Sequence, residues 1–193
     1  MTGRVYAVTM FVHVLGVIAL FGAFVLQHRL IGRLRQAARY EDARPWADLL
    51  VALRSMMPSG VVMLLASGAY LAARLSPRPP SWVAVAAAAV LFIGVVALAV
   101  VNPYITAAHR AVAQGDGPLS GAAARAIASP RVPAALAAAN GAALGTLWLM
   151  TARPATLEAT LVVVVATALG ALIGARVARG AARSPGVHPR QAD

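Results

Sequence analysis

His13 is the residue of this chain best placed to do chemistry, because it is a titratable side chain well inside an apolar stretch. The other histidines, His28, His109 and His188, lie at the ends of apolar stretches or beyond them. Met10 precedes His13 by three residues, and a helix places side chains at that spacing on one face. Imidazole and thioether together suit copper(I). We therefore interpret His13 as a candidate ligand for a cofactor or metal, with Met10 as a weaker metal ligand.

Composition limits what His13 could hold. A b-type haem bound by two histidines of one chain is excluded, because no second histidine lies within an apolar stretch. One histidine with another ligand, a haem at a dimer interface, and a purely structural histidine bonded to a neighbour all stay open. The chain has no cysteine, which excludes thiolate metal sites and iron–sulfur clusters. It shows no nucleophile–base pair, paired carboxylates or phosphate-binding glycine loop, so nothing in it indicates an enzyme.

Three further polar residues are expected inside the same structure. At 1.5 Å per helical residue, His13 and Ser67 both come about 12 Å below the outer surface, which predicts a hydrogen bond between them. Asn140 comes about 6 Å deeper by the same count. Glu158 falls near the outer surface, as does Met150, and a carboxylate in the first turn of a helix also suits the helix dipole. We assign Ser67, Asn140 and Glu158 to the polar interior of a helix bundle.

Five apolar stretches, separated by linkers rich in arginine, must position these side chains. A bilayer core about 30 Å thick needs roughly 20 helical residues to cross it, and each stretch is long enough. A hydrophobic content of 60% also favours an all-α polytopic membrane protein over a soluble domain. The predicted helices span residues 5–27, 55–73, 82–101, 132–152 and 154–175, and residues 180–193 are predicted to be a disordered tail.

Small residues are expected to bring these helices together, since water does not drive helix association inside lipid. Gly141 and Gly145 have the GxxxG spacing, and Gly170 and Gly174 repeat it in the last stretch. We expect them to pack the helices of one chain into a compact five-helix bundle. A homodimer formed through one glycine face is the alternative.

The arginines predict the orientation of the chain. Thirteen of the 17 follow the first, third and fifth stretches, and four lie on the other side. Because arginine and lysine collect in cytoplasmic loops, the N-terminus is predicted outside and the C-terminus in the cytoplasm. Topology thus explains the net charge of +11, and we expect anionic lipid headgroups, not nucleic acid, at the basic side.

Proline and arginine mark the linkers. The basic segment 28–54 has two interpretations, an interfacial helix that binds anionic lipid or an ordinary cytoplasmic hairpin. Pro58 is expected to be tolerated near a helix start or to kink it, and Asn102-Pro103 to end or kink the third helix. Trp82 is expected to anchor that helix at the membrane interface.

The run from His13 through Phe21 to Arg29 and Leu30 resembles the first helix of the CopD-like group of bacterial membrane proteins. This group includes copper-resistance D-type proteins, families of unknown function and HemJ-type protoporphyrinogen oxidases. It shares an early histidine, a small and aromatic patch about eight residues later, and a basic helix exit; residues 54–74 are similar more loosely, through Pro58 and Ser67-Gly68.

The resemblance implies a multi-pass protein of the bacterial cytoplasmic membrane in which His13 is the axial ligand of haem b, or a ligand of copper. An uncharacterised member of the group fits best, since this chain has no lysine and has five apolar stretches. The alternative function is a non-catalytic scaffold or complex subunit whose basic surface binds lipid.

Overall fold

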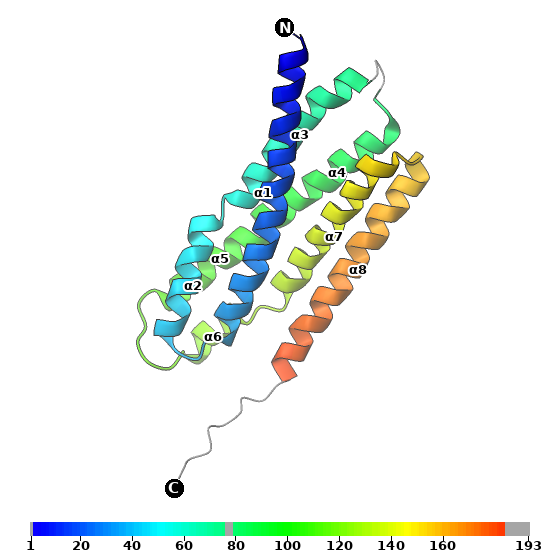
Figure 1. Cartoon of the computed structure of the whole chain (residues 1–193). Coiled ribbons are helices and arrows are strands. Elements are labelled where there is room, and N and C mark those ends of the chain that lie inside the picture. The colour runs from blue at the N-terminus through cyan, green and yellow to red at the C-terminus, as the bar shows by residue number, and fades with distance from the viewer. Residues whose placement is uncertain (1, 76–78, 184–193) are drawn as a thin grey trace.

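The computed structural model describes residues 2–75 and 79–183, and within them almost the whole chain is helical. Its long helices run side by side, with α4 between the α1/α3 pair and the α7/α8 pair (Figure 1). The helices are α1 (Thr2–Gln36), α2 (Tyr40–Leu53), α3 (Met56–Leu75), α4 (Ser81–Val96), the π-helical η1 (Ala97–Val101), α5 (Asn102–Val112), α6 (Gly121–Ile127), α7 (Arg131–Ala152) and α8 (Thr156–Arg183).

Five helical segments within the described residues are long and apolar enough to cross a membrane. This confirms the predicted all-α architecture at the level of its elements. The segments extend over Gly3–Gln36, Tyr40–Arg74, Ser81–Val112, Gly121–Ala152 and Thr156–Gly180.

Several predicted helix ends are wrong because helices continue past the apolar stretches. The first helix runs on to Gln36, since Leu30, Ile31 and Leu34 are buried in the core of the bundle. Residues 180–183 of the predicted tail belong to α8, and residues 184–193 lie outside the described residues. In the linker between α3 and α4, Pro79 and Pro80 are described and Pro80 is the N-cap residue of α4, whereas residues 76–78 lie outside the described residues.

Pro103 does not end the third helix. The chain stays helical from Ser81 to Val112, and the wider π turn of η1 comes directly before the proline, where Asn102 N donates to Ala97 O. A proline has no N–H and its ring crowds the preceding turn, so a wider turn there accommodates it.

Pro58 acts where α2 meets α3. It cannot donate to the carbonyl of Arg54, four residues earlier, and the chain forms a turn at Arg54 and Ser55 between the two helices. The second apolar stretch is therefore preceded by a separate helix, α2, which the sequence did not resolve from the basic linker.

The helices α7 and α8 pack through the predicted glycines. A Cβ atom on Gly141 would overlap the carbonyl oxygen of Ala166, and one on Gly170 would overlap that of Ala137. On Gly174 a Cβ would lie 2.6 Å from Pro133 O, and on Gly145 it would lie 3.1 Å from Val163 Cα. The four glycines thus provide close backbone approach within one chain.

The basic segment 28–54 comprises the end of α1 and the helix α2, which pack together as a helical hairpin and not as a helix lying alone on a surface. Its helix α2 packs against α1 and α5. Leu49 of α2 is 42% exposed and is not part of the face that α2 buries. The buried residues of α2 are Tyr40, Ala43, Ala47 and Leu50.

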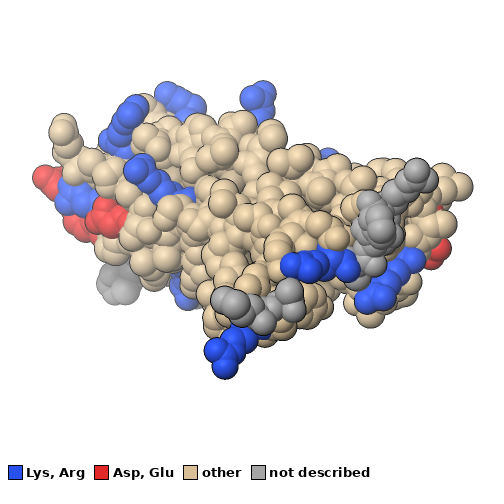
Figure 2. Space-filling model, turned by 90° about the horizontal axis from the view of Figure 1, so that it is seen from above, with Lys and Arg blue, Asp and Glu red and all other residues tan. Residues whose placement is uncertain are grey.

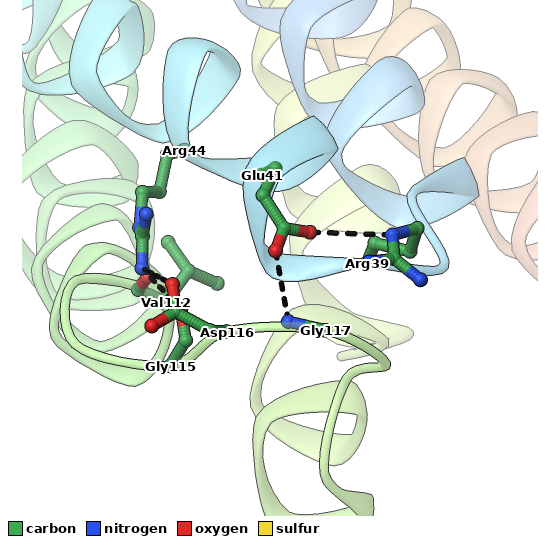
Figure 3. Close-up of polar contacts among 7 residues, drawn as sticks. All are labelled: Arg39, Glu41, Arg44, Val112, Gly115, Asp116 and Gly117. Atoms are coloured by element: carbon green, nitrogen blue, oxygen red, sulfur yellow. Dashed lines mark hydrogen bonds and ion pairs between the residues drawn. The ribbon is translucent and has the colours of Figure 1, made fainter.

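Polar contacts join this hairpin to the loop that follows α5 (Figure 3). Arg44 donates to the carbonyls of Val112 (3.2 Å) and Gly115 and pairs with Asp116 at 3.1 Å. Glu41 accepts from Gly117 N at 2.8 Å and pairs with Arg39 at 3.3 Å. We call this set of contacts the clasp, and it closes one end of the bundle.

Large apolar side chains are exposed along the length of the bundle. The outward face of α8 is the most continuous example. Figure 2 looks onto the end where α1 begins, and uncharged residues cover most of that view. The exposed residues of α8 include Leu157, Leu161, Val164, Val165, Leu169, Leu172, Ile173 and Val177.

Candidate functional site

A cavity of about 480 Å³ lies between α1, α3, α4 and α7, toward the end of the bundle where α1 begins. Leucine, valine and alanine form most of its wall. Volumes of this order are typical of sites for organic ligands, which are mostly apolar with a few placed polar groups. The polar or amphipathic side chains of the wall are Tyr6, His13, Trp82, Thr146 and Arg153.

His13 lines this cavity and is only 8% exposed. Its Nδ1 atom lies 3.0 Å from Ser67 Oγ, so the hydrogen bond expected from the depths of the two residues is present. Ser67 itself donates to the carbonyl of Met63, one turn earlier in α3.

These contacts determine which ring nitrogen of His13 carries hydrogen. A serine hydroxyl has one hydrogen, and Ser67 uses it on Met63 O. Ser67 Oγ must therefore accept from His13, which requires Nδ1 to be the protonated nitrogen. The lone pair of Nε2 is then left for another partner. Histidines that bind metals commonly donate their other N–H in this way.

Close packing of α1 on α3 brings His13 and Ser67 together. A Cβ atom on Gly60 would lie 3.2 Å from Leu20 N, and one on Gly16 would lie 3.1 Å from Met63 Cβ. Glycine at both positions lets the two backbones approach this closely without displacing a neighbour. Gly68 lies beside the imidazole, where a Cβ would make an ordinary contact at 3.5 Å from Cε1 of the ring.

Two methionines line the same cavity. Met10 comes from α1 and Met150 from α7, so the structure brings a second thioether from a different helix to the cavity of His13. Thr146 also lines it, and because its hydroxyl donates to Ala142 O at 2.9 Å, it can only accept from a ligand. Imidazole and thioether are thus the ligand types available here.

The other polar candidates are not part of this cavity. Asn140 is half-buried on α7 and is not among the lining residues. The assignment of Glu158 to the bundle interior is wrong, because this side chain is exposed in the first turn of α8. That position agrees with the helix-dipole interpretation. Across residues 2–75 and 79–183, no three His, Cys, Asp or Glu side chains are grouped as a metal site.

Some site residues were not found by sequence reasoning. Trp82 was expected to anchor a helix at the membrane interface, and the structure adds that it is 9% exposed and lines the cavity, which the sequence did not indicate. Arg153 was treated only as a turn residue, and its place at the cavity follows from helix packing that no local pattern encodes. Gln27 of α1 is not a residue of this cavity; it is 1% exposed, and neither polar atom of its side chain has a hydrogen-bond partner among the described residues.

Comparison with protein-family models, with curated proteins and with solved structures returned no match. A functional conclusion for this chain therefore depends on its own residues and their geometry.

Proposed function

We propose that this chain is an integral membrane protein of the bacterial cytoplasmic membrane that binds haem b through Nε2 of His13. The observation that carries the proposal is the hydrogen-bond chain from His13 through Ser67 to Met63. It leaves the lone pair of His13 Nε2 unused, and His13 lines an apolar cavity large enough for an organic cofactor.

The surface supports membrane insertion. Large exposed apolar faces are rare on soluble monomers, and lipid would cover the outward faces of α1 and α8. Among the described residues, the arginines at the end where α1 begins are Arg4, Arg74 and Arg153. The half of the bundle toward the opposite end holds Arg29, Arg33, Arg35, Arg39, Arg44, Arg54, Arg110, Arg125, Arg131, Arg176 and Arg179.

This asymmetry supports an outside N-terminus and anionic lipid at the clasp end. Since the chain has no cysteine, single cysteines can test the orientation without background. Ala155→Cys and Gln114→Cys place a thiol at exposed positions near opposite ends. A membrane-impermeant maleimide should label the first in intact cells and the second only after lysis. The reverse pattern would contradict the orientation.

Haem fits the cavity better than a lone copper ion. The cavity holds one imidazole and two thioethers in a wall that is otherwise mostly apolar, and its volume exceeds what a single ion requires. Histidine with methionine is an axial pair that haem iron accepts. His13 would hold the iron, with Met150 from α7 as the second ligand, since Met10 lies one turn from His13 on the same helix. When bound, haem would supply one-electron redox chemistry within the membrane.

An absorption spectrum of the detergent-purified protein tests this proposal, together with metal analysis. We expect a Soret band that is lost in His13→Ala and kept in His28→Ala, a matched exchange on the same helix. His28 is outside the cavity and its Nδ1 contacts Phe24 O at 2.9 Å. Stoichiometric copper without a Soret band would replace haem by copper. A colourless, metal-free protein would reject the proposal and favour the scaffold function.

A further inference from the structure

Arg153 has an unusual backbone conformation for its residue type. Its φ of 51° and ψ of 50° lie in the left-handed region, and no other described residue except glycine has a positive φ. The position directly follows the last turn of α7, where Arg153 N donates to Leu149 O at 2.9 Å. Glycine is the usual residue there because it avoids the steric cost of this conformation. An arginine at this position therefore suggests that its side chain has a functional role.

The cavity gives the side chain of Arg153 a place to act. On α7 the cavity wall runs from Ala143 to Arg153, which is about 15 Å of helix. On α1 it runs from Tyr6 to Phe21. At one end of the bundle α1 begins and α7 ends (Figure 1). By their positions along these helices, Tyr6 and Arg153 line the part of the cavity nearest that end, and His13 lies about two turns further along α1 than Tyr6. We call the part nearest that end the mouth of the cavity.

We propose that Arg153 binds a carboxylate of the molecule whose apolar body fills the cavity. An apolar wall excludes a charged group from the interior, so the charged end of a ligand must stay at the mouth. A guanidinium can hold a carboxylate there through two parallel hydrogen bonds. None of the ion pairs within residues 2–75 and 79–183 uses Arg153.

Two classes of ligand carry such a carboxylate, and they differ in the apolar body that fills the cavity. Haem carries propionate carboxylates, and in that case the inference rests on the proposed function. A long-chain fatty acid carries one carboxylate on an apolar chain and does not require His13 to bind iron. The recognition by Arg153 is the same in both cases.

Paired ligands and paired variants test the inference. The full-length protein is titrated with haem and haem dimethyl ester, and with palmitate and methyl palmitate. Arg153→Gly removes the charge and relieves the backbone, so the melting temperature should stay within a few degrees of wild type. Arg74→Gln is the matched control, because Arg74 lies at the same end, does not line the cavity and donates to Tyr70 Oη at 3.2 Å.

We expect Arg153→Gly to weaken binding of the acid form about tenfold and that of the ester less than twofold, while Arg74→Gln changes neither. Equal loss for acid and ester, or no loss for either, would overturn the role of Arg153. If the wild type binds palmitate in this pattern but neither porphyrin, the proposed haem function fails and the role of Arg153 stands. Failure to bind any of the four ligands rejects both.

Discussion

The two ends of this bundle satisfy their polar groups in different ways. At the clasp end, side chains from α2 bond to the loop after α5, and segments far apart in sequence hold each other. At the cavity end, Ser67 and Thr146 donate to carbonyls of their own helices. That local bonding leaves His13 Nε2 and the Arg153 side chain for a ligand. The contacts at the clasp end stabilise the fold, and the cavity end has the unused polar atoms that the proposed function requires.

The largest expected difference in the free energy of unfolding is between alanine exchanges at two glycines, Gly115 at the clasp end and Gly68 at the cavity end. A Cβ on Gly115 would overlap the ring of Tyr40, which is buried and donates to Ser120 Oγ at 3.0 Å, so the ring cannot move away freely. Gly115→Ala should lower the free energy of unfolding by about 2–3 kcal/mol. Gly68→Ala should change the free energy of unfolding far less, because a Cβ there meets His13 only at ordinary contact distance. Thermal unfolding in detergent measures both variants. Equal changes in their melting temperatures would contradict the expected difference in packing between the two ends.

Ser67→Ala should weaken ligand binding more than it destabilises the fold. The exchange removes the acceptor that orients His13, and losing such a partner typically weakens metal or cofactor binding about 10–100-fold. Soret titration measures the affinity for haem. Ser59→Ala, at an exposed position of α3, is the control and should leave it unchanged. An unaltered affinity in Ser67→Ala would mean that its bond to His13 does not orient the ring for binding.

Arg44→Gln should show the opposite behaviour to Ser67→Ala. It removes bonds to two backbone carbonyls and a pairing with Asp116, and about 1–2 kcal/mol of unfolding free energy should be lost. Haem affinity should not change, because the clasp lies at the far end of the bundle from the cavity. Arg110→Gln, at an exposed arginine of α5, is the control and should change the free energy of unfolding very little.

The smallest effect is expected at the pair of His109 and Asp48, whose Nε2 and Oδ1 atoms lie 3.0 Å apart across α5 and α2. Both side chains are largely solvated, so Asp48→Asn should cost below about 0.5 kcal/mol. A double-mutant cycle with His109→Gln isolates the pair. A coupling energy well above that value would show that the clasp extends further along α2 than its central contacts.

Sequence reasoning reached part of the site because depth in a membrane is a one-dimensional quantity. His13 and Ser67 lie on adjacent antiparallel helices, and counting residues from the shared surface brings them to one level. The same count cannot say which way a side chain points around its helix. Glu158 was therefore placed inside although it is exposed, and the burial of Trp82 against the cavity was not predicted.

By itself the sequence determined the five apolar helices, the glycine pairs that join α7 to α8 and the likeness in depth of His13 and Ser67, because each follows from local composition and spacing. Only the tertiary structure decided that Met10, Met150 and Arg153 share the cavity of His13, and that the linkers close the other end through Arg44 and Glu41. The physical reason is that helices apolar on every side carry no pattern for the face that meets a neighbour. That face is selected by close packing at residues such as Gly16 and Gly60.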